Sequence, residues 1–318
     1  MNRPLELMLN YLRGRFCSRS INENLIKDPD VVKKMICDLL NSNKPCMIAR
    51  YGAFEGAVVL NYTGIINSDR SYYKYIKGQC EAWWWNKHLL NCLCINAGFF
   101  PLKDEYIQRY CELMLEDSSQ IDIVGCFDNN DNAERLRTYH HNCKYVRLAC
   151  LEPDYYSKDS SKEWTSCLKG RRVLVVHPFA ETIKSQYAKR TKLFIDSDFL
   201  PEFELLTIKA IQSIGGVNSK YATWFEALRA MQNEMDMLDY DIAILGCGAY
   251  GFNLAAHAKR TGHKAIHLGG STQILFGIRG KRWENMKEFK RLMNSYWVRP
   301  SDIDKPQSAL RVEGGCYW

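Results

Sequence analysis

Long hydrophobic runs are missing from this 318-residue sequence. No stretch approaches the ~20 apolar residues that a membrane-spanning helix needs. The longest apolar runs, residues 173–176 and 242–245, have the length of buried parallel strands. Residues 1–20 mix arginine and glutamate with apolar residues and do not resemble a signal peptide. These absences predict a cytoplasmic protein, and its 46% hydrophobic residues are enough for a buried core.

The thirteen cysteines form no recognisable pattern. Their number is odd and no Cys-x-x-Cys is present, which excludes a disulfide scaffold and favours a reducing compartment. A zinc site is not expected, because its candidate ligands match the spacing of no common finger or ribbon. These candidates are Cys92, Cys94, Cys126, His140, His141 and Cys143.

The formal net charge is +7, yet no basic block of five or more residues is present. The cations gather in short clusters at 169–172, 189–190 and 279–282. Without an RNA-binding signature, nucleic acid is not an expected partner. The charge fits a solvated surface with a pocket for an anionic substrate. Weak peripheral attraction to the inner face of an anionic membrane, and a homo-oligomer, are also compatible with it.

Internal repeats, low-complexity tracts and linkers are absent as well. Residues 1–45 are expected to form an N-terminal helical segment and residues 46–318 a single domain. Residues 71–115 are predicted to be mostly helical and aromatic around residues 83–85. Strands alternate with helices elsewhere, which predicts an α/β, Rossmann-like fold with a largely parallel sheet and flanking helices. Strands are expected at 47–49, 121–126, 145–150, 172–178, 203–209, 241–245 and 264–268, and helices at 30–40, 52–60, 179–189, 219–238 and 250–261.

Two glycine-rich turns each follow an apolar run. The first contains Arg50 and Gly52, and the second has the pattern Gly246-x-Gly248-x-x-Gly251. Backbone amides in such turns approach anionic ligands, and the following helix directs its positive end to the same place. Because parallel strands end at one edge of a sheet, both turns are expected to border one site for a phosphorylated substrate.

The second turn matches the dinucleotide-binding fingerprint. That fingerprint also needs an acidic residue after the next strand, which here ends Ile266-His267-Leu268-Gly269-Gly270. The missing acid counts against a dehydrogenase and against an S-adenosylmethionine-dependent methyltransferase. The turn is therefore expected to bind a phosphate of the substrate, together with Tyr250. The alternative is that its glycines only allow close packing of strand and helix.

Other polar residues follow the predicted strands. A Gly-Gly turn with hydroxyl, amide and cationic residues predicts a diphosphate clamp, with a solvated loop as the alternative. A histidine at the end of the strand at 172–178 could contact a phosphate or an acceptor hydroxyl, or only hold structure. The candidate donor-binding residues are His177, Thr182, Gly270, Thr272, Gln273, Lys281 and Arg282.

Glu55 lies three residues beyond Gly52, at the start of a predicted helix. There its carboxylate could accept a proton from an attacking hydroxyl, or bind a sugar hydroxyl or a metal. The alternative is a glutamate that stabilises the helix N-terminus, with Arg50 as its ion-pair partner.

The run Arg50-Tyr51-Gly52-Ala53-Phe54-Glu55 resembles the Arg-x-Gly-x-x-Glu motif of the GT-D-fold bacterial glycosyltransferases. The likeness continues in order through residues 173–176, 241–251 and 266–270. It implies a GT-D-like fold and sugar transfer from a nucleotide-diphosphate sugar. The implied acceptor is a lipid-linked or protein-linked glycan of surface polysaccharide or glycoprotein biosynthesis. Glu55 would be the general base of an inverting reaction, and Arg50 would hold Glu55 or contact phosphate.

Ala53 departs from the family pattern, in which this position is an aspartate that helps bind a divalent metal. Glu55 alone offers too few oxygen ligands for Mg²⁺ or Mn²⁺. We therefore assign no metal cofactor from the sequence, and we expect Lys281 and Arg282 to neutralise the leaving diphosphate. Two other functions are carried as alternatives. One is a non-catalytic nucleotide-binding protein of a polysaccharide locus, and the other a methyltransferase.

Overall fold

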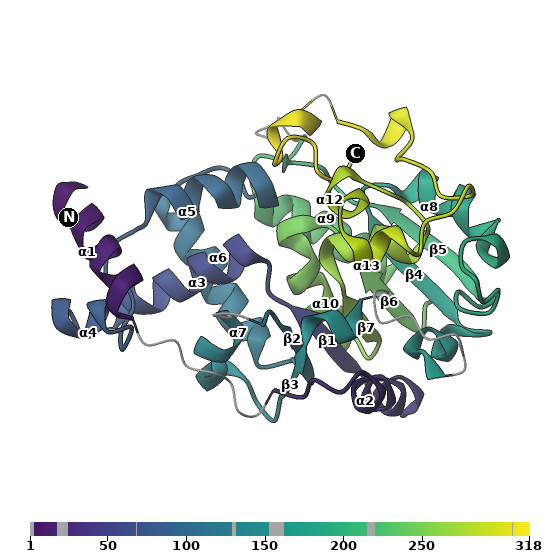
Figure 1. The fold of residues 1–318 in the computed structure, drawn as a ribbon, viewed down its shortest axis with the longest axis horizontal. Helices are drawn as coiled ribbons and strands as arrows, with labels where there is room; N and C mark the ends of the chain where they lie inside the picture. Colours follow the sequence, from purple (N-terminus) through teal and green to yellow (C-terminus); the bar gives the residue numbers. More distant parts are fainter. Residues whose placement is uncertain are drawn as a thin grey trace.

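The computed structural model of the chain describes residues 3–17, 25–67, 69–128, 132–152, 162–214, 220–306 and 308–318. Seven parallel strands form one sheet in the order β3-β2-β1-β7-β6-β4-β5 (Figure 1). Helices flank it, so the fold is α/β, as the sequence predicts. The strands are β1 (Cys46–Arg50), β2 (Ile123–Cys126), β3 (Lys144–Arg147), β4 (Arg172–His177), β5 (Glu204–Lys209), β6 (Ile242–Leu245) and β7 (Lys264–His267).

The helices connect these strands and extend both ends of the chain. The α-helices are α1 (Arg3–Phe16), α2 (Pro29–Asn41), α3 (Ala53–Ile66), α4 (Tyr72–Ile76), α5 (Lys87–Cys92), α6 (Asp104–Ser118), α7 (Asn132–Arg135), α8 (Ala180–Tyr187), α9 (Trp224–Asp236), α10 (Gly251–Arg260), α11 (Thr272–Leu275), α12 (Lys281–Glu284) and α13 (Lys287–Lys290). Short helical turns used below are η1 (Leu93–Ala97), η3 (Leu148–Leu151), η6 (Trp164–Leu168), η9 (Gly248–Tyr250) and η10 (Gly269–Ser271).

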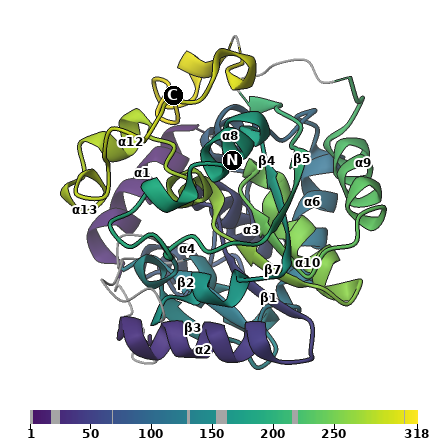
Figure 2. The same cartoon turned by 90° about the vertical axis from the view of Figure 1, so that its right-hand side faces the viewer.

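Two hydrophobic cores cover the two faces of the sheet. Successive side chains of a strand point to opposite faces, so Met47 and Ala49 enter one core while Cys46 and Ile48 enter the other. The first core includes side chains from α3, α6, α9 and α10, and the second from α2, α8, α11, α12 and α13. Figure 2 shows α6, α9 and α10 on one side of the strands and α12 and α13 on the other. Both faces are thus buried, as a fully parallel sheet requires.

The central strands β1 and β7 are neighbours, although most of the chain separates them. They pair in parallel, with Met47 opposite Ala265 and Ile48 opposite Ile266. The helix after β1, α3, contributes to the first core, whereas α11 after β7 contributes to the second. The two connections therefore leave the sheet toward opposite faces. Such a divergence opens a crevice at the carboxyl ends of the strands, where α/β proteins bind ligands.

All seven predicted strands are present, with boundaries that shift by a few residues. The third ends early, at Arg147, because Leu148–Leu151 turns into a 3-10 helix. The helix expected at 219–238 begins at Trp224, where the Thr223 side chain accepts a hydrogen bond from Glu226 N. Residue 219 itself lies outside the described residues. Residues 71–115 are mostly helical, as predicted, although residues 83–85 at their centre are not.

The N-terminal helices attach to the rest of the fold in different ways. Helix α2 buries Val32, Ile36 and Leu40 in the second core, against the sheet. Helix α1 instead packs through Leu9 on a separate small cluster with Tyr75 and Trp84. Residues 3–16 and 29–41 are helical as predicted, while the division of the chain at residue 45 stays a prediction.

A buried ion pair ties α2 to η6. Lys33 Nζ lies 2.6 Å from Glu163 Oε1, and each side chain is only 5% exposed. Removing one member of such a pair takes this partner away from the other buried charge, which costs more than the intact pair contributes. The next residue, Lys34, pairs with Asp38 in solvent on the same helix.

We expect Lys33→Met to lower the free energy of unfolding by about 3 kcal/mol. Lys34→Met, the matched control, should change it by less than about 0.5 kcal/mol because an exposed pair contributes little. Replacing both partners, Lys33→Met with Glu163→Leu, should regain most of the free energy of unfolding that Lys33→Met alone loses. Urea unfolding measures all three values. Equal losses for the two lysine variants would contradict the assignment.

Candidate functional site

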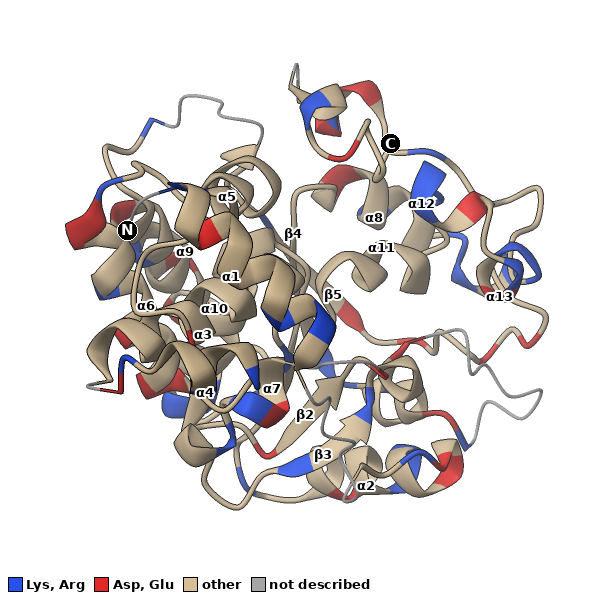
Figure 3. Ribbon diagram, turned by 60° about the vertical axis from the view of Figure 1, so that its left-hand side comes forward, with Lys and Arg blue, Asp and Glu red and all other residues tan. Residues whose placement is uncertain are grey.

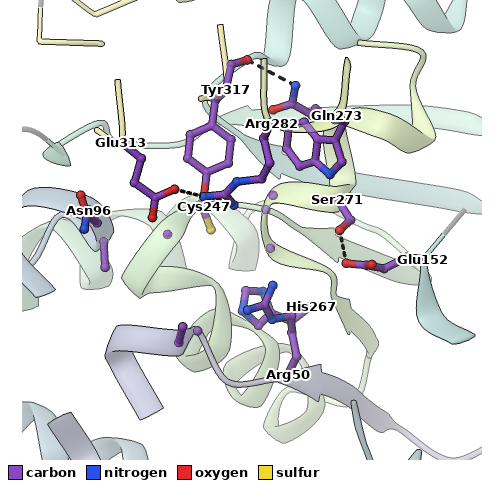
Figure 4. A pocket seen from close by; sticks show the side chains of 18 of the residues that line it. Arg50, Asn96, Glu152, Cys247, His267, Ser271, Gln273, Arg282, Glu313 and Tyr317 are labelled. Atoms are coloured by element: carbon purple, nitrogen blue, oxygen red, sulfur yellow. Dashed lines mark hydrogen bonds and ion pairs between the residues drawn. The ribbon is translucent and has the colours of Figure 1, made fainter. Parts of the chain in front are cut away.

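A cavity of about 1000 Å³ opens at the carboxyl ends of the strands. Residues that follow all seven strands line it, together with α12, α13 and the last residues of the chain. Figure 4 shows Arg50 and His267 on one side of it and Arg282, Glu313 and Tyr317 on the other. The two predicted glycine turns therefore border one cavity, as the sequence suggests.

Arg50 is the last residue of β1, and its side chain lines the cavity. Its Nε donates a hydrogen bond to Tyr51 O at 3.1 Å, and its guanidinium carbon lies 4.9 Å from the centre of the Phe127 ring. Within the described part of the chain no carboxylate forms an ion pair with it. The terminal N–H groups of a guanidinium in this setting can donate to an anionic ligand.

Glu55 bends back over the start of its own helix. A Cβ added at Gly52 would coincide with the Glu55 carboxylate, so this glycine leaves the space that the carboxylate occupies. Burial has the largest influence on Glu55 and raises the pKa of its carboxyl above the ordinary value. The backbone N–H of Glu55 and the charge of Arg50 oppose that rise. The helix N-terminus is thus filled by a carboxylate that lines the cavity.

Glu152 is a second cavity carboxylate, which the sequence analysis missed. Its Oε1 accepts a hydrogen bond from the Ser271 hydroxyl, as Figure 4 shows. Burial raises the pKa of Glu152, and the charges of Arg50 and Arg282 act in the opposite direction. It follows the strand expected at 145–150 by two residues, so its place at the end of a parallel strand was a usable signal.

The last residues of the chain, 313–318, form a C-terminal strap that walls the cavity. The Arg282 guanidinium pairs with the Glu313 carboxylate and donates from Nη1 to the Tyr317 hydroxyl at 3.1 Å. The backbone N–H of Arg282 donates to Cys316 O at 2.9 Å. Arg282 therefore lines the cavity as predicted, with a carboxylate of the same chain as its partner.

Two buried histidines line the cavity in the neutral form. Burial lowers the pKa of His177 and of His267 to about 3 each. His177 Nδ1 accepts from Phe179 N at 2.9 Å, so its proton is on Nε2. His267 Nδ1 donates to Leu245 O at 3.2 Å, which leaves its Nε2 as an acceptor. One histidine thus offers a donor and the other an acceptor.

The second glycine turn packs closely on neighbouring segments. A Cβ at Gly246 would lie 2.7 Å from Gly269 O, and one at Gly248, where φ is +57°, would lie 2.7 Å from Ala97 O. A Cβ at Gly251 would collide with the His267 ring. Gly246, Gly248 and Tyr250 nevertheless line the cavity, as do Gly52 and Gly270. The glycines of this turn thus allow close packing, and the turn also borders the cavity.

Four predicted donor-binding residues lie outside the lining. The Thr182 hydroxyl donates to Asp304 Oδ2 at 2.7 Å, and the Thr272 hydroxyl is buried and donates to Leu245 O at 3.3 Å. Gly251 is buried against His267, and Lys281 Nζ reaches Gly314 O at 3.4 Å. Their polar groups serve the fold, so we leave all four out of the proposed site.

Gln273 borders the cavity but holds the C-terminal strap. Its Nε2 donates to Ile278 O at 3.1 Å and to Tyr317 O at 3.3 Å. The aromatic residues 83–85 do not line the cavity. Trp84 packs on Tyr75 instead, in a small hydrophobic cluster.

The residues around Glu55 do not fit a divalent metal. Ala53 is exposed and has no side-chain oxygen to act as a ligand, and the Glu55 carboxylate is turned onto its own helix. Among the described residues, no group of three or more His, Cys, Asp and Glu side chains is placed to hold an ion. The positive charge of the cavity comes from arginines, Arg50 and Arg282 together with Arg147 and Arg291.

Comparisons with known proteins give little further information. No family model matches the chain, and no curated protein gives a significant match. Among solved structures, the chain is similar to a selenomethionine-substituted structure of domain of unknown function 1792 (DUF1792). The identity is 12%, the TM-score is 0.39, and the match covers 93% of this chain and 96% of the other. A likeness of this degree carries no functional argument. The described part of the chain contains no helix with the length and apolar character needed to cross a membrane.

The buried histidines predict a loss of stability in acid. An unfolded histidine titrates near pH 6.5, and these titrate at about 3. Between these pH values the unfolded state binds more protons than the folded state. The contribution of the two neutral histidines to the free energy of unfolding is therefore complete above about pH 6.5 and is lost as the pH falls. At pH 5 each should lower the free energy of unfolding by about 2 kcal/mol.

The double variant His177→Asn/His267→Asn should flatten the fall in Tm between pH 7 and pH 5. The asparagine side chain can replace both hydrogen bonds, since it offers an acceptor to Phe179 N and a donor to Leu245 O. His88→Asn, at an exposed position, is the control and should behave as the unmodified protein. An unchanged pH slope in the double variant would refute the prediction.

Proposed function

We propose that the protein is a glycosyltransferase that moves a sugar from a nucleotide-diphosphate sugar to a glycan acceptor. The observation that carries this proposal is the convergence of arginines and carboxylates in one cavity. Arg50 and Arg282 line opposite sides of it, and Glu55 and Glu152 line it as well (Figure 4). Cations that neutralise a leaving group, beside a carboxylate that accepts a proton, are what sugar transfer from a diphosphate requires.

The size and the lining of the cavity support a substrate larger than phosphate alone. A volume of about 1000 Å³ lies at the upper end of the range for small-molecule sites. Aromatic side chains such as Phe179, Trp283 and Trp318 line it beside the charged ones. Such rings can stack on a nucleobase or a sugar, while the polar groups fix the orientation. A nucleotide sugar has parts that suit both kinds of lining.

Arg50 and Arg282 hold the diphosphate in the proposed complex. Arg50 has no carboxylate partner in the described part of the chain, and Arg282 pairs with Glu313. The diphosphate would replace the Glu313 carboxylate as the partner of Arg282, since guanidinium groups bind phosphate oxygens in a paired geometry. The Nε2 proton of His177 offers one further donor, and the backbone amides of Gly248 and Gly270 lie at the same edge of the sheet.

Glu55 acts as the general base in this mechanism. The acceptor hydroxyl gives its proton to the Glu55 carboxylate while its oxygen forms a bond to the anomeric carbon. The bond from that carbon to the diphosphate breaks, and its electron pair stays with the diphosphate beside the two arginines. Attack opposite the leaving group inverts the anomeric centre. A carboxylate raised in pKa by burial accepts a proton more readily than an ordinary one.

The acceptor in this proposal is a lipid-linked or protein-linked glycan of a surface polysaccharide or glycoprotein, and the reaction needs no divalent metal. The motif Arg50-x-Gly52-x-x-Glu55 supports the acceptor class through its resemblance to GT-D-fold enzymes. The misfit of a metal at Ala53 supports the metal independence. Binding of a donor without turnover would favour the non-catalytic alternative.

Glu55→Gln should lower sugar transfer at least about 100-fold with little change in donor affinity, because a proton acceptor is lost while the shape is kept. The donor is found by titrating UDP, GDP, dTDP and CMP sugars, each with EDTA and with Mn²⁺. Glu226→Gln is the matched control. That residue is also a first-turn helical glutamate, and its Oε2 accepts a hydrogen bond from Ala222 N at 3.0 Å, outside the cavity. Full activity of the folded Glu55→Gln protein would exclude this mechanism.

The pH dependence of the rate gives a separate check on Glu55. The base works only when ionised, and burial raises its pKa. The rate should therefore fall as the pH is lowered, starting above the range of an ordinary glutamate near pH 4.3. Gly52→Ala should remove this acid limb along with most of the activity, because the new methyl group displaces the Glu55 carboxylate. An acid limb that survives in Gly52→Ala would assign it to another group.

Arg282→Gln and Glu313→Gln should change donor affinity in opposite directions. The first removes a cation from the diphosphate and should weaken binding roughly 10–100-fold. The second removes the competing carboxylate and should tighten binding several-fold. Arg279→Gln, at an exposed residue three positions away and outside the cavity lining, is the control. Calorimetry with the matching nucleoside diphosphate measures all three. Weaker binding in both cavity variants would mean that the pair only holds the strap.

A further inference from the structure

The inner face of helix α1 packs on α4 and on the residues that follow it. Leu9 is buried against Tyr75 and Trp84. Arg13 donates from Nη1 to the carbonyl oxygens of Tyr75 at 3.0 Å and Cys80 at 2.7 Å, and it pairs with Glu81 at 3.1 Å. Asn10 Oδ1 accepts from the Tyr75 hydroxyl at 2.5 Å. These contacts hold α1 on α4 and need no further apolar side chain.

The outer face of the same helix is apolar as well. Leu7, Met8 and Tyr11 are 61%, 52% and 66% exposed, and their spacing of three and four residues places them on one side of the helix. Phe16, at the C-terminal end of the helix, is exposed too, on the side of Leu9. Neighbouring α4 adds exposed rings, and both helices lie at the same end of the molecule (Figure 1). We call this the α1–α4 surface, made of Leu7, Met8, Tyr11, Phe16, Tyr72 and Tyr73.

Elsewhere in the described ranges, exposed apolar residues have no comparable grouping. Ile195, Met237 and Ile303 are 86%, 85% and 73% exposed, but each stands alone in its segment. Single exposed residues of this kind are normal on a protein surface, whereas a group on one face marks an interaction site. The α1–α4 surface is therefore a candidate interaction site. Ile195, Met237 and Ile303 provide matched controls.

Cations surround the α1–α4 surface. Arg3, Arg15, Arg70 and Lys77 have no ion-pair partner within the described ranges. The charged groups of Arg15 and Lys77 lie 5.9 and 5.8 Å from the centre of the Phe16 ring. The acidic residues here are Glu6, which is partly buried, and Asp69, which pairs with Lys74 at 2.6 Å. Figure 3 shows Lys and Arg at one end of α1.

We propose that the α1–α4 surface binds an anionic lipid bilayer, with α1 lying along its interface. Apolar side chains enter the boundary of the acyl chains, and the cations stay at the phosphate level, as in other interfacial helices. A second copy of the chain fits less well. A two-fold contact would place these cations against each other, and of the described acidic residues here Glu6 is partly buried and Asp69 is already paired with Lys74. The proposal does not depend on the function of the cavity.

Cosedimentation with vesicles tests it on the full chain. We use vesicles of phosphatidylcholine with about 30% phosphatidylglycerol, and of phosphatidylcholine alone. The protein should bind the anionic vesicles at least about tenfold more strongly, and high salt should remove most of this preference. Leu7→Ser/Met8→Ser/Tyr11→Ser should lower binding to anionic vesicles by about tenfold or more, since interfacial affinity scales with buried apolar area.

The control variant Ile195→Ser/Met237→Ser/Ile303→Ser should bind vesicles as the unmodified protein does. Arg3→Gln/Arg15→Gln should lose only the preference for anionic lipid. Circular dichroism and Tm establish that each variant is folded. The proposal is overturned if the unmodified protein does not bind anionic vesicles, or if the control loses as much as the α1 variant. A dimer that the α1 variant abolishes, without vesicle binding, would assign the surface to a second copy.

Discussion

The parallel pairing of β1 with β7 is the constraint on which the site depends. It joins two strands that most of the chain separates, and it brings Arg50 next to the turn at Gly269. Because α3 and α11 then leave toward opposite faces, the space between them stays open above the sheet. The carboxylates, the histidines and the C-terminal strap are arranged around that space. A different neighbour for β1 would disperse every one of these groups.

Much of the architecture could be predicted from the sequence, because local patterns encode it. Short β-branched runs such as residues 173–176 mark strands buried on both faces. Arg50 and Glu55 could be placed since a glycine turn after a strand puts both at the ligand-binding edge. Glu152 also follows a parallel strand, but it is not part of a recognisable sequence motif. The hydroxyl groups of Thr182 and Thr272 were misplaced because short buried side chains find partners inside the protein.

The C-terminal strap could not be predicted, since its position depends on contacts between distant residues. Gln273 and Arg282 hold Tyr317 through hydrogen bonds that no local sequence pattern predicts. Glu313 and Gly314 both have positive φ, so the chain turns sharply there. Helix α1 is a second feature of this kind. Its sequence predicts a helix, but only the packing on Tyr75 and Trp84 shows which of its two apolar faces is left outside.

The ion pair between Arg282 and Glu313 has a consequence for selectivity under the proposed function. A carboxylate held on the same chain competes at an effective concentration on the order of millimolar or above. A monovalent anion, or inorganic phosphate at low concentration, therefore binds Arg282 several-fold more weakly than it would without Glu313. A diphosphate that reaches Arg50 at the same time binds through two points and overcomes this competition. The strap would thus favour the longer, doubly anchored donor over small anions at Arg282.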